Sequence, residues 1–357
     1  MLQQSSPAYL GQLIEKLTTE KNLSDEEFSV LIDSSMASGT TELLAAAADK
    51  VRRQNYSLEV YIRGLIEITN YCKNNCYYCG IRAGNTCAER YRLSQEQILA
   101  CCTEGYALGF RTFVLQGGED PYFTDDLICR LVEQIHKHFA DCAITLSLGE
   151  KDRSAYEAYY QAGANRYLLR HETADELHYA RLHPHSMSLP NRKRCLWDLK
   201  EIGYQVGAGF MVGSPYQTTA NLVSDLRFLQ KLQPDMIGIG PFIHHKDTPF
   251  KNELDGTLDL SLRMLSILRL CFPYALLPST TALNTIAPDG RELGLQAGGN
   301  VVMPNLSPAA VRSKYQLYDN KLTTGLEAAQ GLESLKLSIA EIGYTVKIDR
   351  GDVISHL

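Results

Sequence analysis

The sequence predicts an α/β fold: a complete (β/α)8 TIM barrel with an N-terminal helical extension and a C-terminal helical tail. After residue 58, short apolar or β-branched runs alternate with longer segments of helical period, which is typical of repeated βα units around a parallel sheet. The chain has 357 residues, and a barrel domain needs about 250. The runs number eight, enough to close a barrel, and are Tyr61–Ile68, Thr112–Gln116, Ala143–Leu148, Arg166–Arg170, Val206–Val212, Met236–Gly240, Ala275–Pro278 and Asn300–Met303.

The segments between and before these runs carry helix signals. Ser24-x-x-Glu27 and Ser94-x-x-Gln97 both have the pattern of a capping box, in which two side chains satisfy free amides at a helix start. The stretches from Asp125 to Phe139 and from Leu222 to Leu232 have helical periodicity.

The domain boundaries follow from where these patterns change. We predict a helical extension over residues 1–57, the barrel over residues 58–318, and a tail over residues 319–357 that packs on the barrel. No repeat of solenoid period, low-complexity tract or Pro/Ser-rich linker divides the sequence further.

Composition excludes several classes of protein. Hydrophobic residues make up 45% and charged residues 21%, as in soluble globular proteins. The net charge is −6 and no long Lys/Arg block occurs, so we expect no nucleic-acid partner. We also expect no membrane association and a cytoplasmic location, because no apolar run is long enough to span a bilayer and Met1 to Leu10 lacks the features of a secretory signal.

Three cysteines have the spacing of metal ligands. Cys72, Cys76 and Cys79 follow the first predicted strand, at the end of a barrel where active sites lie. In a cytosolic protein such a cluster of thiols indicates metal binding, yet no fourth Cys or His stands at the spacing that a structural zinc site needs. Three thiolates suit a 4Fe-4S cluster whose fourth iron stays open to a small molecule. We expect the other cysteines to be small buried hydrophobes.

Polar residues stand at the ends of the next two predicted strands. In Gly117-Gly118-Glu119, the glycines allow a close backbone approach and Glu119 supplies an acceptor for a ligand ammonium. Thr145 and Ser147 alternate along their strand and therefore point to the same side, where two hydroxyls can bind a polar ligand.

Later strand ends add charged and polar groups. Arg170, His171 and Glu172 place a guanidinium, an imidazole and a carboxylate at the presumed active face, although a solvated charge cluster is the alternative. The last two strands and the residues beyond them contribute Thr280, Thr281, Met303, Tyr315 and Tyr318.

The cysteine motif, with Tyr78 just before its last cysteine, resembles that of the radical S-adenosylmethionine (SAM) superfamily. The resemblance implies one 4Fe-4S cluster and SAM as cofactors. The open iron would bind the amino and carboxylate groups of SAM, and an electron from the cluster would cleave the sulfonium to give a 5′-deoxyadenosyl radical. Gly117-Gly118-Glu119 resembles the Gly-Gly-Glu-Pro element that holds the SAM amine in this superfamily.

Further blocks, in order between about Leu58 and Tyr318, resemble the HydE family of radical SAM maturases, which act in assembly of the FeFe-hydrogenase H-cluster. These blocks are Leu168–Thr173, Gly207–Gly213, Ile237–Ile243, Thr280–Ala282 and Asn300–Asn305. The resemblance implies an enzyme that cleaves SAM reductively and directs the radical to sulfur of a cysteine-bound iron carbonyl cyanide precursor. It also implies transient contact with partner maturases and an electron donor.

The same resemblance assigns residues to two ligands. It implies that Glu172 and Arg192 contact SAM, with Glu119 and Met211 nearby. It implies a pocket for a small organometallic or thiol-containing substrate, lined by Thr145, Ser147, Arg170, Thr280, Thr281, Met303, Tyr315 and Tyr318. Some family members hold a second cluster through cysteines beyond the last strand, but here no cysteine follows Cys271, so we expect a single cluster.

Other functions remain open on the sequence. Methylornithine synthase and biotin synthase resemble this chain in cluster loop and barrel, although biotin synthase needs ligands for a second cluster and no convincing set occurs. A different class is a non-catalytic iron–sulfur scaffold. A scaffold would not need SAM-binding groups spread over several strand ends.

Overall fold

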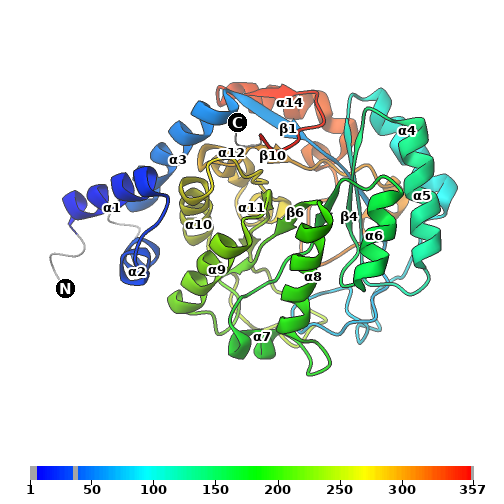
Figure 1. The fold of residues 1–357 in the computed structure, drawn as a ribbon, viewed down its shortest axis with the longest axis horizontal. Coiled ribbons are helices and arrows are strands. Elements are labelled where there is room, and N and C mark those ends of the chain that lie inside the picture. Colours follow the sequence, from blue (N-terminus) through cyan, green and yellow to red (C-terminus); the bar gives the residue numbers. More distant parts are fainter. Residues whose placement is uncertain (1–5, 35–38, 355–357) are drawn as a thin grey trace.

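The computed structural model describes residues 6–34 and 39–354. Residues 1–5 and 35–38 of the predicted extension and residues 355–357 of the predicted tail lie outside the described residues. The chain has an α/β fold in which a parallel sheet is surrounded by helices (Figure 1). The helices α1 and α2 project from one side of the molecule in Figure 1.

The central sheet has six parallel strands in the order β2-β3-β4-β5-β6-β8. Two smaller sheets have the orders β10-β1-β11 and β7-β9. The strands are β1 Glu59–Ile62, β2 Gly64–Thr69, β3 Thr112–Gly117, β4 Ala143–Ser147, β5 Arg166–Leu168, β6 Gln205–Ala208, β7 Met211–Val212, β8 Met236–Ile237, β9 Gly240–Pro241, β10 Val301–Val302 and β11 Thr345–Lys347. The α/β class and the parallel sheet expected from the sequence are confirmed.

Single parallel bridges continue the pairing beyond these strands. Met236 of β8 pairs with Leu276, Pro278 pairs with Val301 of β10, and Asn305 pairs with Leu65 of β2. The predicted run Ala275–Pro278 therefore makes isolated bridges and no ladder, so its prediction as a regular strand is wrong.

Three other predicted strands, Tyr61–Ile68, Val206–Val212 and Met236–Gly240, are each divided in two. Tyr61–Ile68 breaks at Arg63, between β1 and β2. Val206–Val212 breaks at Gly209, whose φ of +153° ends the extended run between β6 and β7. A side chain there would collide with the carbonyl oxygen of Gly238, 1.9 Å from the position of a Cβ atom, at the break between β8 and β9.

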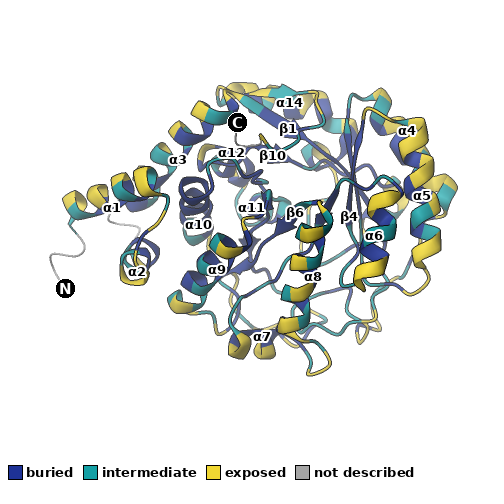
Figure 2. Cartoon of the chain, viewed as in Figure 1, coloured by how far each residue is buried: buried dark blue, intermediate teal, exposed yellow. Residues whose placement is uncertain are grey.

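The helices α4, α5, α6, α8 and α9 bury one side and expose the other, as Figure 2 shows, and most of their buried residues are apolar. Both predicted capping boxes, at Ser24 and Ser94, are confirmed. The helices are α1 Pro7–Glu20, α2 Asp25–Asp33, α3 Thr40–Tyr56, α4 Gln95–Ala107, α5 Asp125–His138, α6 Arg153–Gln161, α7 Glu176–Leu182, α8 Leu189–Ile202, α9 Thr219–Leu232, α10 Leu258–Cys271, α11 Thr281–Ile286, α12 Gly290–Gln296, α13 Ala309–Arg312 and α14 Leu332–Glu341.

The N-terminal helices help to cover a helix that is buried all round. Every residue of α10 from Ser261 to Cys271 is buried, and α3 packs closely along it. A helix without an exposed face must be covered on all sides. Arg52 of α3 also forms hydrogen bonds to two other segments: its Nη2 donates to Glu59 O of β1 at 2.8 Å, and its Nε donates to Gly299 O at 3.0 Å.

The C-terminal region is only partly helical. Two short 3-10 turns, Gly325–Glu327 and Ala329–Gly331, precede α14, and β11 then pairs in parallel with β1. The sequence prediction of a helical tail missed this strand. Beyond it, the Asp352 carboxylate accepts hydrogen bonds from Arg166 Nη2 at 2.6 Å and Gln205 Nε2 at 2.8 Å, next to the first residues of β5 and β6.

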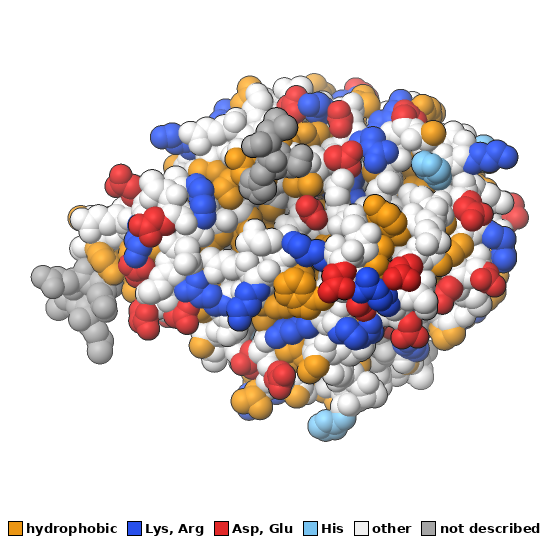
Figure 3. Space-filling view, in the orientation of Figure 1, with side chains coloured by type: hydrophobic (Ala, Val, Ile, Leu, Met, Phe, Trp, Pro, Cys, Tyr) orange, Lys and Arg blue, Asp and Glu red, His pale blue; other side chains and the backbone are white. Residues whose placement is uncertain are grey.

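The surface has mixed charge. Among the described residues visible in Figure 3, acidic and basic side chains alternate and no continuous basic stripe occurs. Of the helices in the part of the chain that the structure describes, none is long and apolar enough to cross a bilayer.

Candidate active site

The strands β2, β3, β4 and β5 run parallel, so the loops that follow them meet at one edge of the sheet, here called the carboxyl edge. The loop after β2 carries Cys72, Cys76 and Cys79. Its fold is set by Arg90, whose guanidinium donates to several loop carbonyls, including Ile81 O at 2.8 Å and Arg82 O at 2.7 Å.

The three cysteines are close together, half-buried and not in disulfides. Burial is the main reason why the pKa of Cys76 rises to about 12; Arg192 opposes the rise and the neighbouring Cys72 contributes to it. Burial likewise raises the pKa of Cys79, with added contributions from Cys76 and Cys72. The thiols therefore influence one another electrostatically and are protonated at neutral pH, so binding a metal centre would displace protons.

The loop after β3 packs directly on the cysteine loop. A side chain at Gly118 would lie 2.2 Å from Tyr71 O and 2.7 Å from the Cβ atom of Cys72, so only glycine allows this approach. Glu119 lies between two neighbouring loops. Its Oε2 is 3.3 Å from Lys73 Nζ, and its Oε1 accepts a hydrogen bond from Glu150 N at 3.1 Å.

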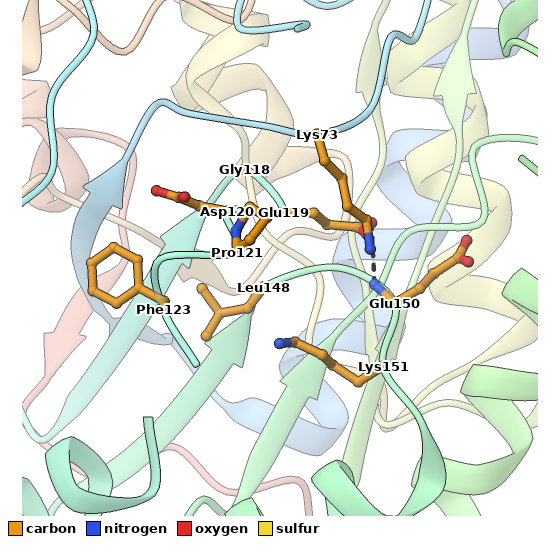
Figure 4. Close-up of a pocket in the computed structure, with 9 residues that line it drawn as sticks. All are labelled: Lys73, Gly118, Glu119, Asp120, Pro121, Phe123, Leu148, Glu150 and Lys151. Atoms are coloured by element: carbon orange, nitrogen blue, oxygen red, sulfur yellow. Dashed lines mark hydrogen bonds and ion pairs between the residues drawn. The ribbon is translucent and has the colours of Figure 1, made fainter. Parts of the chain in front are cut away.

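These loops enclose a cavity of about 130 Å³. Figure 4 shows Lys73 reaching toward Glu119 and Glu150 from the cysteine loop, while Lys151 enters from the other side. The residues that line the cavity come from the loops after β2, β3 and β4. They are Lys73, Gly118, Glu119, Asp120, Pro121, Phe123, Leu148, Glu150 and Lys151.

Two ion pairs extend the site along the carboxyl edge. Arg170 Nη2 lies 3.0 Å from Glu172 Oε2, and Arg192 Nε of α8 lies 2.6 Å from Glu150 Oε1. Arg192 Nη1 also donates to Arg170 O at 3.3 Å, which links the two pairs. Burial alone would lower the pKa of Arg192, but Glu150 and other neighbours outweigh it and raise the pKa.

Tyr78 and Met211 lie on the other side of the cysteine loop. Tyr78 Oη is 3.2 Å from His183 Nε2, and both tyrosines of the loop pack on the apolar cluster that contains Met211. His183 in turn stacks on Tyr179 with ring centres 3.9 Å apart. This histidine therefore supports the loop.

Several buried polar atoms near the site have no hydrogen-bond partner among the described residues. They include Thr145 Oγ1, Thr280 Oγ1 and Arg170 Nε. Buried donors and acceptors without partners are costly, and a ligand is a common reason for them. The Nε and Nη2 atoms of Arg63 are unpaired as well, but its Nη1 lies 2.9 Å from Sδ of Met236, the first residue of β8, at the opposite end of the strands from the cysteine loop.

Three other predicted substrate residues, Tyr315, Tyr318 and Ser147, differ in their burial and in their neighbours. Tyr315 is buried, and its hydroxyl is 3.5 Å from Gln116 Nε2. Tyr318 lies near enough to Arg170 for that cation to influence its pKa, which burial raises. Ser147 is half-buried at the end of β4.

Two predicted substrate residues are less available than expected. The Thr281 hydroxyl donates to Glu327 Oε2 at 2.6 Å, so this hydroxyl already has a protein partner. Met303 packs on a cluster that contains Tyr61, Met236 and Val301, all at or near the starts of their strands. It therefore lies deeper than the carboxyl edge.

Comparison with known proteins identifies the family. Residues 66–229 match the model of the radical SAM superfamily. The chain is 48% identical over 284 residues to the [FeFe] hydrogenase maturase subunit HydE of Thermotoga maritima, covering 80% of this chain and 81% of that protein. The chain is a radical SAM enzyme of the HydE family.

Related enzymes are similar at lower identity. The 3-methylornithine synthase of Methanosarcina barkeri is 31% identical over 324 residues, which cover 90% of this chain and 91% of that protein. The crystal structure of methylornithine synthase (PylB) superposes with a TM-score of 0.82 at 28% identity, covering 94% of this chain and 97% of that one. The fold and the sequence therefore agree on the same group of enzymes.

The radical SAM family implies a 4Fe-4S cluster and SAM, and the cysteine loop fits the cluster. In the part of the chain that the structure describes, no group of three or more His, Cys, Asp or Glu side chains is arranged to hold a single metal ion. A four-iron cluster instead binds each thiolate to a different iron, which suits three thiols that are near one another without converging on one point.

Sequence reasoning did not select Lys73 or Glu150 as site residues. Glu150 follows directly after a predicted strand, as the selected residues do. Nothing in the sequence indicates that Lys73 pairs with Glu119, because that contact depends on how two loops pack.

Proposed function

We propose that this chain is a maturase of the [FeFe]-hydrogenase: it cleaves SAM reductively and directs the resulting radical to sulfur of a cysteine-bound iron carbonyl cyanide precursor. The observation that carries the proposal is the 48% identity to HydE of Thermotoga maritima, against 31% to methylornithine synthase. The Arg170 guanidinium and the buried hydroxyls without partners at Thr145 and Thr280 also suit an anionic, polar substrate.

In this proposal Cys72, Cys76 and Cys79 hold a single 4Fe-4S cluster. When bound, the cluster and SAM supply the electron and the carbon radical that perform the chemistry.

The residues at the carboxyl edge would bind and orient SAM. Gly117 and Gly118 allow its close approach, and Glu119 accepts a hydrogen bond from its ammonium group in exchange for Lys73. Glu172 and Arg192 would contact SAM from the loops after β5 and from α8. Tyr78 and Met211 would provide apolar contacts, because both belong to one apolar cluster beside the cysteine loop.

The substrate would lie deeper in the molecule than SAM, away from the carboxyl edge. Arg170 would bind its anionic groups by charge-assisted hydrogen bonds. Hydroxyl groups and Met303 would line the rest of the substrate pocket. The Thr281 hydroxyl would keep its hydrogen bond to Glu327 there. The lining residues in this proposal are Thr145, Ser147, Arg170, Thr280, Thr281, Met303, Tyr315 and Tyr318.

We further propose that the sheet closes into a complete eight-stranded barrel over residues 58–318. The support is the series of single parallel bridges that joins β8 to Leu276, Pro278 to β10 and Asn305 to β2. A closed barrel would shield the radical from solvent. Transient binding of partner maturases and an electron donor at the open carboxyl edge completes the proposal.

The test is an anaerobic maturation assay in which this chain is the only source of HydE activity. We expect hydrogenase activation that depends on SAM and on this chain, and no conversion of lysine to methylornithine in a parallel assay. The methylornithine assay includes a methylornithine synthase as positive control. Methylornithine formation without hydrogenase activation would overturn the proposal. Tight binding of a cluster without SAM cleavage would instead favour a scaffold.

A further inference from the structure

His171 stands between Arg170 and Glu172 in the sequence but points away from them. Its side chain is fully buried and lies against Phe228 and Phe210, with ring centres 4.9 and 5.9 Å away. Its Nε2 is 3.2 Å from Asp225 Oδ1 on α9. The imidazole therefore packs between the sheet and the outer helices and does not reach the carboxyl edge.

Asp225 holds the turn that follows. The same Oδ1 atom accepts a hydrogen bond from Ala174 N at 2.5 Å, and Asp225 is fully buried. On the other side of the turn, Lys193 Nζ of α8 donates to Ala174 O at 2.9 Å. Residues 171–174 are thus fixed to two helices outside the sheet, through side chains that have no part in the proposed chemistry.

Glu172, inside this turn, has a backbone conformation that needs support. Its φ of +66° lies in the left-handed region, which is unfavourable for a residue with a side chain. Such a conformation persists only where the surroundings impose it. Within the backbone, His171 N and Glu172 N both donate to Gly209 O, at 2.9 and 3.1 Å, and Gly209 N approaches His171 Nδ1 at 3.4 Å.

We propose that Asp225 and His171 are positioning residues: as a buried pair they impose the left-handed turn at Glu172 and so direct the Arg170–Glu172 ion pair toward SAM and substrate. This inference rests on the proposed function only in giving Glu172 a contact with SAM. The geometry supports the role because the side chains of Arg170 and Glu172 meet 3.0 Å apart at the carboxyl edge while His171, between them, is anchored behind it.

The chain offers a matched control. Asp235, directly before β8, also accepts a backbone hydrogen bond, from Val206 N at 2.8 Å, but at the start of β6, on the opposite edge of the sheet from the candidate site. Asp235→Ala and Asp225→Ala each remove one carboxylate that satisfies a backbone amide. If Asp225 has a purely structural role, Asp225→Ala should weaken SAM binding no more than Asp235→Ala does.

The experiment compares wild type, Asp225→Ala, Asp225→Asn and Asp235→Ala, each with a reconstituted cluster. Hydrogen exchange measures the protection of the amides in residues 170–174, and equilibrium dialysis measures the dissociation constant of SAM. For Asp225→Ala we expect faster exchange in this turn and SAM binding weakened by about 10- to 100-fold, as for other residues that orient ligand-binding groups. Asp225→Asn keeps the oxygen acceptor and should stay near wild type. Iron content should be unchanged throughout.

Two results would overturn the proposal. The first is Asp225→Ala with exchange and SAM affinity equal to those of Asp235→Ala. The second is faster exchange in the turn with unchanged SAM affinity, which would show that the turn is held by Asp225 but does not serve the SAM site. Neither result depends on hydrogenase activation, so failure of the proposed function in the maturation assay remains distinguishable.

Discussion

Replacing Arg170 with alanine removes the guanidinium that we assign to the substrate. In the structure its Nη2 lies 3.0 Å from Glu172 Oε2, and the Arg170 side chain is 30% exposed. Truncating one partner of a buried charge pair costs about 2 to 5 kcal/mol. Because water screens a side chain of this exposure, we expect the lower end, about 2 kcal/mol, or roughly 30-fold in substrate binding.

The assay measures hydrogenase activation and 5′-deoxyadenosine release in parallel, under anaerobic conditions with the partner maturases. Activation should fall more than SAM cleavage, because Arg170 is assigned directly to the substrate and would affect SAM only through its ion pair with Glu172. Arg170→Lys is the control, since it keeps the charge but loses the paired geometry of the guanidinium and should give an intermediate defect. Equal losses of both activities, or normal activation by Arg170→Ala, would refute the assignment.

Three further predictions follow from single side chains. The first is Lys321→Met, which leaves Glu67 without its cation; Glu67 is fully buried and its carboxylate lies 2.6 Å from Lys321 Nζ. Denaturant unfolding should show that the free energy of unfolding falls by about 3 kcal/mol, and a second change, Glu67→Gln, should largely restore it. Thr280→Val removes a hydroxyl without a protein partner, so stability should stay within about 0.5 kcal/mol while activation falls; a parallel loss of stability would contradict a ligand role. Burial alone would raise the pKa of Asp352, but Arg166, together with Gln205 and Arg350, lowers it to about 2. Its stabilising effect should therefore be complete above about pH 4 and disappear toward about pH 2, and thermal unfolding of Asp352→Asn should lack this part of the pH dependence.

The fold could be predicted from the sequence where a pattern is local. The alternation of apolar runs and helical segments indicated the parallel sheet, and Ser24 and Ser94 marked two helix starts correctly. The breaks at Arg63 and Gly209 and the strand β11 could not be predicted. Their conformations depend on close contacts between segments far apart in the chain, such as the approach of Gly209 to Gly238.

The candidate site shows the same division. The cysteine spacing identified the family, because three ligands in one short loop are a local signal. By contrast, the sequence placed His171 at the active face, whereas the structure pairs it with Asp225, 54 residues further along the chain. Thr281 is likewise engaged by Glu327, 46 residues away. Which side chains form such long-range hydrogen bonds depends on tertiary packing and cannot be predicted from spacing or periodicity.

The most direct test of the cluster assignment is electron paramagnetic resonance of the reduced, anaerobically reconstituted protein, recorded with and without SAM, beside its iron content. We expect about four irons per chain and a 4Fe-4S signal that changes when SAM binds. In the variant with Cys72, Cys76 and Cys79 all replaced by alanine, both the signal and the iron should be lost. A full 4Fe-4S signal in that triple variant, or a wild-type signal that does not respond to SAM, would contradict the assignment.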